Sequence, residues 1–309
     1  MHTKGQRLPR YRRAPTDHLP LKLTDQDIHD FLWLYECRLL TSWHLRLVDP
    51  RSDQFVIRRS QKFFHHKYVS RIPTSSHNEV FLYAIANRGM DELTIRFPEK
   101  ITRGAIDWDK KNNELKDSRS IAHTLMSSNF WVALHLDLKD HPHVALSPES
   151  PGNELIYARE GKPCKVKPDK SFTLIDRARG RTMHFFREDD RSTMPNERTT
   201  LPDKDFLDKL RGYWQFYKQE KEKARQGLPA LAGFRVLVTC KTLQRAENLR
   251  AIAKKADNLQ KGSDLYWFTQ EQTYFPPYTD RERFFESRQS LFSPLWKTPT
   301  SDQFRQLLQ

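Results

Sequence analysis

The spacing of apolar residues changes near residue 66, and this change constrains the fold of the first part of the chain more than any other feature. Before it, apolar residues recur every three or four positions, which is the period of one helix face. Thr24 and Asp27 form a capping-box-like pair at the start of the first helix. The pattern predicts three helices, which begin near Leu23, at Thr41 or Ser42 and after Ser52, and which end near Tyr35, Val48 and His66.

After residue 66 the pattern is that of strands. Two strands are expected at 68–72 and 80–85, joined by the turn-rich residues 73–79. Three helices followed by a two-stranded hairpin make a winged helix-turn-helix, in which the third helix enters the DNA major groove and the hairpin rests on the backbone. We therefore predict a winged-helix DNA-binding domain over residues 23–92.

Charge favours a polyanionic partner. The chain has 53 Lys and Arg residues against 39 Asp and Glu, a net charge of +14, and 14 of these basic residues but only 7 acidic ones lie in residues 1–75. Each phosphate contact releases condensed counterions, so double-stranded DNA is the expected partner. An inert basic surface is the alternative that charge alone leaves equally open. The expected DNA contacts are Arg58, Arg59, Lys62 and Lys67 around the third helix, and Arg12 and Arg13 in a basic flexible arm at 1–22.

Other features argue against several classes of protein. Cys37, Cys164 and Cys240 are far apart and form no CxxC pair, so a zinc site or a redox dithiol is not expected. The longest apolar runs are far shorter than the ~20 residues that span a bilayer. The N-terminus is basic but lacks the apolar segment of a secretory signal. These observations predict a soluble, cytoplasmic protein.

Beyond residue 92 the chain is expected to form a linker and a second domain. Residues 93–117 have mixed charge and little periodicity, which is typical of a linker. An unusually apolar helix should begin at Ser118 or Ser120 and form part of the core of a domain over residues 118–309. Strands that alternate with helices in this domain indicate an α/β core with a mixed sheet. The expected strands lie at 154–158, 165–167, 172–176, 182–187, 234–240 and 264–269, with helices from Asp203 and at 243–256.

The segment 167–195 is the part most suited to chemistry. Asp169 precedes a predicted strand, and Glu188 and Asp190 follow an apolar run, so a hairpin could bring three carboxylates together. Asp189 would face the other way on an extended strand. Carboxylates suit Mg²⁺, which can polarise a phosphoryl oxygen for hydrolysis. The alternative is that these acids are solvated turn residues.

Several motifs resemble the replication-relaxation family of plasmids and integrative elements over almost the whole chain. They are LMSSN at 125–129, FFREDDRSTMP at 185–195 and KLRGYWQFYK at 209–218. The resemblance implies an α+β protein, with an N-terminal winged helix and a mixed-sheet α/β domain similar to restriction endonucleases of the PD-(D/E)XK superfamily. It also implies a role in plasmid replication, relaxation or mobilisation, with replication or relaxosome proteins as partners. A homodimer is a further expectation. The matching positions are His123, Asn129, Pro168, Asp169, Glu188, Asp190, Arg191, Thr193, Pro195, Lys209 and Tyr213.

Two departures from the family pattern affect the expected activity. Asp190 stands where the superfamily has a lysine, two residues after the glutamate, and Ser192 replaces a usual glycine. Lys209, or more weakly Lys204, could replace that lysine. One expectation is a Mg²⁺- or Mn²⁺-dependent DNA nickase in which Asp169, Glu188 and Asp190 hold the metal and Lys209 assists. The other is a catalytically inactive DNA-binding accessory factor or transcriptional regulator at an origin or promoter.

Two tyrosines of the same predicted helix offer a further alternative. Tyr213 or Tyr217 could act as the nucleophile and conserve phosphodiester energy in a phosphotyrosine. At helical spacing with Trp214, such residues more often pack a core or stack on a base.

Overall fold

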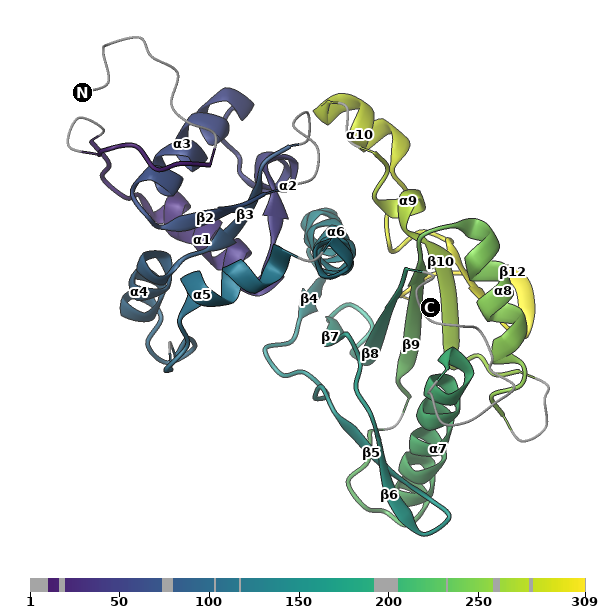
Figure 1. Cartoon of the computed structure of the whole chain (residues 1–309). Coiled ribbons are helices and arrows are strands. Elements are labelled where there is room, and N and C mark those ends of the chain that lie inside the picture. The colour runs from purple at the N-terminus through teal and green to yellow at the C-terminus, as the bar shows by residue number, and fades with distance from the viewer. Residues whose placement is uncertain are drawn as a thin grey trace. The chain divides into compact units, whose positions relative to one another are not determined.

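The computed structural model is a mixed α+β protein (Figure 1). It describes residues 11–16, 20–73, 80–102, 104–116, 118–191, 205–231, 233–257, 262–277 and 280–308. Contacts divide the chain into two compact units, Met1–Val132 and Ala133–Gln309. Among the described residues, the helices are all too short or too polar to cross a membrane.

The first unit contains the three expected helices and the two expected strands. They are α1 (Asp25–Cys37), α2 (Ser42–Val48), α3 (Asp53–His65), β2 (Val69–Ile72) and β3 (Leu82–Ile85). Thr24 and Asp27 form the expected capping box. The strands β2 and β3 are antiparallel, and a short strand that the sequence analysis did not predict, β1 (Leu40–Thr41), adds to the other side of β3. The ring of Phe31 packs 4.9 Å from that of Phe63 on α3 and so joins the first helix to the third.

The segment expected to be a linker holds ordered helices. It follows the start of α4 (Asn87–Arg96) and includes α5 (Trp108–Asn113) and a 3-10 turn at Glu114–Lys116. Trp108 is buried, and the buried Asn112 donates a hydrogen bond of 2.7 Å to the carbonyl of Ile85. One tryptophan and one asparagine fix this short polar helix through contacts distant in sequence. Hydrophobic periodicity could not reveal it.

The helix α6 (Ser118–Asp140) is the predicted apolar helix. Its first part belongs to the first unit and its last part to the second. In the first unit, the hydroxyl of Ser128 donates to the carbonyl of Leu39 at 2.6 Å. This hydrogen bond links α6 to the segment between α1 and α2.

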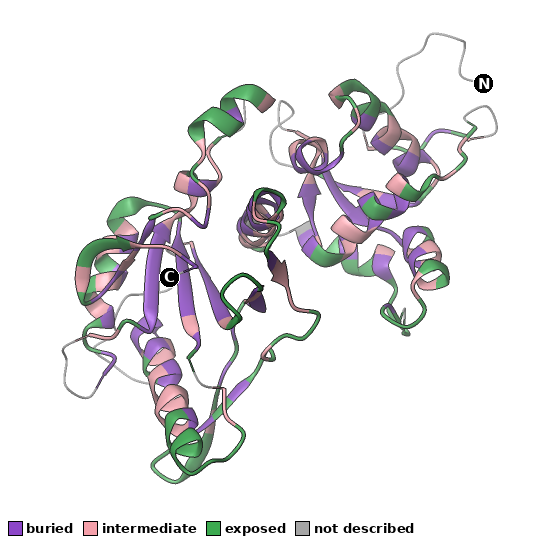
Figure 2. Ribbon diagram, turned by 180° about the vertical axis from the view of Figure 1, so that it is seen from behind, coloured by how far each residue is buried: buried purple, intermediate pink, exposed green. Residues whose placement is uncertain are grey.

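The second unit is built on a seven-stranded mixed sheet, ordered β12-β11-β10-β9-β8-β7-β4. The strand β9 pairs in parallel with β8 on one side and with β10 on the other. The other neighbouring strands are antiparallel. Figure 2 shows that the central strands are buried along most of their length. The strands are β4 (Val144–Leu146), β7 (Lys170–Asp176), β8 (Arg181–Asp190), β9 (Arg235–Cys240), β10 (Tyr266–Gln270), β11 (Trp296–Thr298) and β12 (Ser301–Arg305).

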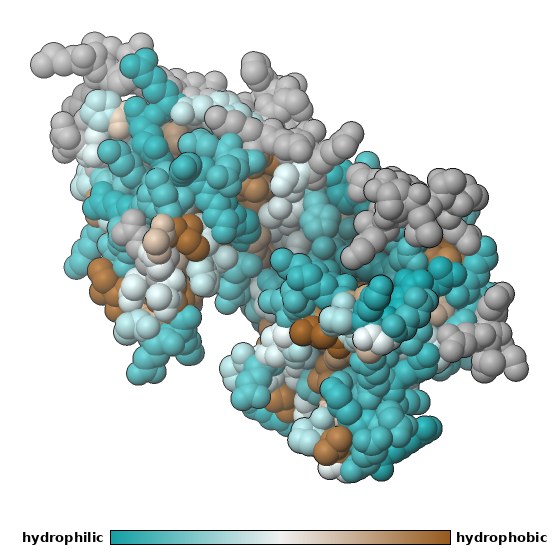
Figure 3. All heavy atoms as spheres, turned by 60° about the horizontal axis from the view of Figure 1, so that its bottom comes forward, coloured by the Kyte–Doolittle hydropathy of each residue, from teal (hydrophilic) through white to brown (hydrophobic). Residues whose placement is uncertain are grey.

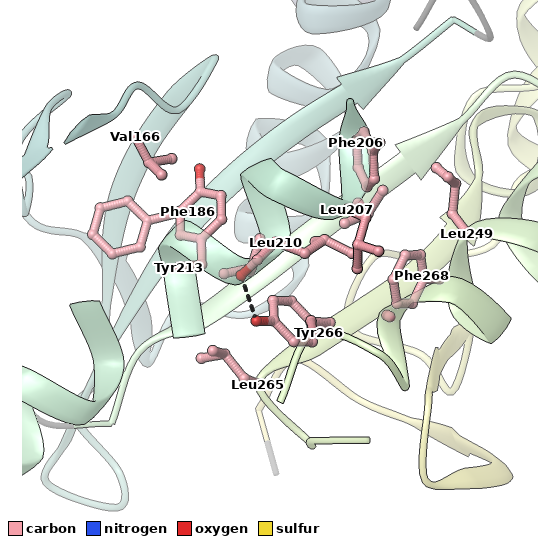
Figure 4. Close-up of a cluster of buried hydrophobic side chains, with 14 of the residues drawn as sticks. Val166, Phe186, Phe206, Leu207, Leu210, Tyr213, Leu249, Leu265, Tyr266 and Phe268 are labelled. Atoms are coloured by element: carbon pink, nitrogen blue, oxygen red, sulfur yellow. Dashed lines mark hydrogen bonds between the residues drawn. The ribbon is translucent and has the colours of Figure 1, made fainter. Parts of the chain in front are cut away.

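Two helices pack on one face of this sheet and form the main core of the unit. The helix α7 (Phe206–Arg225) follows β8, and α8 (Leu243–Ala253) follows β9. Apolar side chains of α7, such as Leu210 and Tyr213, lie with Phe186 and Phe268 of the sheet in one buried cluster (Figure 4). The residues expected to start α7 at Asp203 lie outside the described part, and the helix is capped by Asp205.

Three features of the second unit differ from the sequence-based expectation. The strand β8 runs to Asp190 rather than ending near residue 187, because its last residues pair in parallel with β9. After the expected strand at 264–269, where no further element was predicted, the chain forms the helices α9 (Glu271–Tyr274) and α10 (Arg281–Ser287) and adds β11 and β12 to the sheet. The strands β5 (Leu155–Arg159) and β6 (Lys162–Val166) form a separate hairpin.

This hairpin packs closely on α7 at Gly212. A Cβ atom on Gly212 would lie 2.3 Å from a methyl carbon of Val166 and 3.1 Å from the hydroxyl of Tyr157. Only glycine therefore allows the helix and the hairpin to approach this closely.

Candidate functional site

The acidic run at the end of β8 consists of Glu188, Asp189 and Asp190, whose side chains point to the two faces of the sheet. Arg187, Glu188, Asp189 and Asp190 are all buried. Because side chains alternate along a strand, Glu188 and Asp190 share one face while Arg187 and Asp189 share the other. Glu188 and Asp190 contact α7 and α8, respectively. A cluster of this kind is costly to bury unless each charge has a partner.

Asp169 reaches the end of β8 through the β7–β8 hairpin. The register of the hairpin places Lys170 opposite Arg187, and the amide of Asp169 donates to the Arg187 carbonyl at 3.0 Å. In turn, the amide of Asp189 donates to the Asp169 carboxylate at 2.7 Å. Asp169 itself is exposed. The predicted hairpin thus brings Asp169 and the acidic run together, with one carboxylate facing solvent.

Glu188 is held by two side chains of α7. Lys209 makes an ion pair with one oxygen of its carboxylate, and the Tyr213 hydroxyl donates to the other at 2.5 Å. Lys209 and Tyr213 are four residues apart and so lie on one face of the helix. Lys209 therefore contacts the acid cluster, as it must if it replaces the lysine that is missing two residues after Glu188.

The electrostatics of this group follow from its burial. Burial raises the pKa of Glu188 to about 8, and the nearby Asp169 charge adds to the shift, while Lys209 and Tyr213 oppose it. Burial by itself lowers the pKa of Lys209, but the carboxylates of Glu188 and Asp169 raise it above its ordinary value overall. Lys209 therefore remains a cation beside the two acids.

Asp190 is engaged elsewhere. Both of its carboxylate oxygens accept from Arg245 of α8, at 2.6 and 3.0 Å, and its side chain is buried. Asp189, on the opposite face, makes a fully buried ion pair with Arg187. Sequence reasoning missed both arginines. Arg187 could have been found from its position beside the acids, whereas nothing in the sequence connects Arg245 with Asp190.

The acids differ in how well they suit a divalent cation. Asp169 offers an exposed carboxylate, and Glu188 lies close enough for the two charges to affect each other. Oxygen donors of this kind fit Mg²⁺ or Mn²⁺. Asp190 fits less well, because a bidentate arginine already occupies both oxygens. Ser192, Thr193, Pro195 and Lys204 lie outside the described residues.

The two tyrosines of α7 have packing roles in this structure. Tyr213 is fully buried, and burial together with Glu188 holds its pKa well above the ordinary value of 10. Its hydroxyl points to a carboxylate and not to solvent. Tyr217 is half-buried and packs against Trp214 and Phe234, with ring centroids 5.7 Å away in each case. This geometry supports the packing alternative.

Of the two family-pattern positions on α6, His123 and Asn129, Asn129 makes a structural hydrogen bond. Asn129 accepts from the Nε2 of His44 at 2.6 Å, while the Nδ1 of His44 accepts from the amide of Thr41. Burial lowers the pKa of His44 to about 4, so this ring is neutral near pH 7. Asn129 therefore anchors α2 to α6 within the first unit. His123 lies half-buried on the same helix.

The expected DNA-contacting residues separate into two groups. Arg59 forms an ion pair with the buried Asp27, and Arg13 donates to the carbonyl of Phe64 at 3.0 Å, so both stabilise the fold of the first unit. Arg58 and Lys67 are exposed, and Lys62 is half-buried. Arg12 is exposed as well. These four cations can reach a ligand without breaking an internal ion pair that fixes the fold.

Comparison with known proteins gives a family match. A family model described as replication-relaxation matches residues 31–231, about two thirds of the chain. Searches of curated proteins and of solved structures found no match.

Proposed function

The chain belongs to the replication-relaxation family, and from this premise we propose that it binds and nicks the DNA of a mobile element during replication or relaxation. One observation carries the nicking part of the proposal. Asp169 lies directly before β7, Glu188 on β8 and Lys209 on α7, yet the Asp169 carboxylate accepts from the amide next to Glu188 and Lys209 forms an ion pair with Glu188. Two carboxylates and a lysine are the groups that metal-dependent phosphodiester hydrolysis needs.

In this proposal the first unit binds duplex DNA as a winged helix. The order of α1, α2, α3 and the β2–β3 hairpin is the order of elements in that fold. Arg58 and Lys62 lie on α3 and Lys67 lies two residues after its end, so they would contact DNA there, with Arg12 on the backbone. The first quarter of the chain also carries about half of the net charge.

Each residue of the cluster then has a separate task. Asp169 and Glu188 would hold a divalent cation, which polarises a phosphoryl oxygen when bound. Lys209 offsets negative charge that develops on the phosphate. Tyr213 fixes the orientation of the Glu188 carboxylate. Asp190 and Asp189 secure the strand through Arg245 and Arg187. Water is the proposed nucleophile, since the hydroxyl of Tyr213 is buried. Its attack on phosphorus breaks one P–O bond of the DNA backbone, and a proton of the water passes to the leaving oxygen, so that one end keeps the phosphate and the other becomes a hydroxyl.

A plasmid-nicking assay tests this proposal. Supercoiled DNA that carries the origin of the element is incubated with the full chain and Mg²⁺ or Mn²⁺. We expect open-circular product with the wild type and a loss on the order of 100-fold in Asp169→Asn and Glu188→Gln, as for removal of a catalytic electrostatic group. Glu286→Gln, which changes an exposed acid on α10, is the control and should nick like the wild type. Supercoils that persist with wild-type protein and both cations would exclude the nickase.

One observation favours a second function, that of a catalytically silent DNA-binding factor. Glu188 and Asp190 already have basic partners within the protein, Lys209 and Arg245. Asp190 also stands at the position where the PD-(D/E)XK pattern has a lysine. Under this alternative the wild type retards origin DNA in a gel but leaves its supercoiling unchanged.

A further inference from the structure

A groove of about 700 Å³ opens between the β5–β6 hairpin and the first turns of α7. Its lining includes Ile156 and Tyr157 of β5, Lys165 of β6, Lys167 and Lys209. We propose that this groove binds an unpaired DNA strand beside the phosphate that is cleaved. The inference rests on the proposed function and adds the form of DNA that the site accepts.

The lining combines the two surfaces that an unpaired nucleotide needs. Ile156 supplies an exposed apolar surface beside the buried Tyr157 and Val166, and the exposed Lys167 and Arg159 supply positive charge. An unpaired nucleotide presents a flat apolar base together with a charged phosphate, and base stacking on aromatic side chains is a general means of binding single strands. A duplex keeps its bases stacked inside, so its phosphates would leave the apolar wall without a partner.

Of the three acids that line the groove, two pair with basic side chains and the third caps α7. Glu154 pairs with Lys165 at 3.3 Å, and the Asp205 carboxylate accepts from the amide of Asp208 at the start of α7. Asp208 is also 3.5 Å from Arg211. The exposed side chains of Lys167 and Arg159 therefore leave the groove with a positive character that complements a phosphate backbone.

The groove is continuous with the acid cluster. Lys209 lines the groove and also makes the ion pair with Glu188. Lys167 lies two residues before Asp169 in the chain. A strand held along the hairpin would therefore have one of its phosphates next to Asp169 and Glu188.

Ile156 is the best position for a test because it is 64% exposed, so a charged replacement should not disturb the core. Figure 3 shows hydrophilic side chains over most of the visible surface, with apolar side chains only in small patches. Phe304 on β12 is a matched control, since it is 52% exposed and belongs to the strand at one edge of the seven-stranded sheet, whereas the β5–β6 hairpin and the start of α7 line the groove.

The experiment measures fluorescence anisotropy of a labelled single-stranded oligonucleotide and of its duplex, with the full chain and without divalent cation. Ile156→Glu should weaken single-strand binding about tenfold, because it removes one apolar contact with a base, and should leave duplex binding unchanged. Phe304→Glu should bind both as the wild type does. Lys167→Gln should reduce the slope of log affinity against log salt by about 0.7, whereas Lys254→Gln, at an exposed position after α8, should not.

Two results would overturn the inference: equal single-strand affinity for Ile156→Glu and wild type, or an equal loss in Phe304→Glu. Neither result depends on cleavage. If the nicking assay fails while Ile156→Glu still loses single-strand binding selectively, the groove stands and the nickase does not. If nicking requires Glu188 but Ile156→Glu binds single strands normally, the nickase stands and the groove does not.

Discussion

At the scale of single residues, the pairing of buried charges decides what each acid of β8 can do. Glu188 contacts a lysine and a tyrosine, Asp190 an arginine on another helix, and Asp189 the neighbouring Arg187. Removing one partner from such a pair leaves an uncompensated buried charge. The acids are therefore not interchangeable, although three of them are adjacent in the sequence.

Tyr213→Phe tests the hydrogen bond that orients Glu188. The Tyr213 hydroxyl is buried and has a carboxyl partner, so its loss should lower the free energy of unfolding by about 1–3 kcal/mol. Tyr217→Phe, in a half-buried ring on the same helix, should change it by less than about 0.5 kcal/mol. Urea denaturation measures both values. Equal stability of Tyr213→Phe and wild type would show that Tyr213 does not support Glu188.

His44 gives the first unit a dependence on pH. Its pKa is about 4 in the folded protein, because the ring is buried, and about 6.5 in the unfolded chain. Between these values the unfolded chain binds more protons, so the free energy of unfolding falls as the pH falls from 6.5 to 4, by up to about 3 kcal/mol. Denaturation at several pH values should show this loss as the difference between the wild type and His44→Gln, because burial raises the pKa values of Asp30 and Glu188 to about 8 and these acids contribute in the opposite direction.

The matched variants for this prediction are His44→Gln and His29→Gln. His44→Gln removes the buried ring and should therefore lack the loss of stability that His44 causes between pH 6.5 and 4. His29 is an exposed residue of α1, and its replacement should leave the wild-type profile unchanged. A wild-type profile in His44→Gln would assign the pH dependence to other groups.

At the scale of elements, α3 carries two adjacent arginines with different tasks. Arg58→Ala should weaken duplex binding and reduce the salt slope by about 1, because it removes one phosphate contact. Its stability should stay within about 0.5 kcal/mol of the wild type, since Arg58 is exposed. Arg59→Ala should instead lower the free energy of unfolding by about 2 kcal/mol, because it removes one of the two arginines that pair with the buried Asp27, the other being Arg51. Gel retardation and denaturation separate the two effects, and the reverse pattern would move the DNA surface away from this face of α3.

Elements with a strong period were predictable and short elements were not. The period of 3–4 residues located α1, α2 and α3, and the apolar run before Glu188 located most of β8. The helix α5 and the strands β1, β11 and β12 are only two to six residues long. Their conformation depends on partners far away in the chain, such as Ile85 for Asn112 and β10 for β11.

At the scale of the whole molecule, the two units divide the proposed task. The first unit contains the basic helix α3, and the second contains the acid cluster at the end of a strand in a mixed sheet. The family match covers parts of both units. Recognition and cleavage of DNA would then reside in one polypeptide, with the unpaired strand bound by the β5–β6 hairpin.

The sequence by itself determined the family, the mixed α+β class, the helices of the first unit and the placement of Asp169 beside the acidic run. All of these follow from composition, motifs or spacing within short segments. Only the tertiary structure decided that Lys209 contacts Glu188 while Arg245 holds Asp190. These partners lie 21 and 55 residues apart. Their meeting depends on parallel pairing of β8 with β9 and on the packing of α7 and α8, which no local pattern encodes.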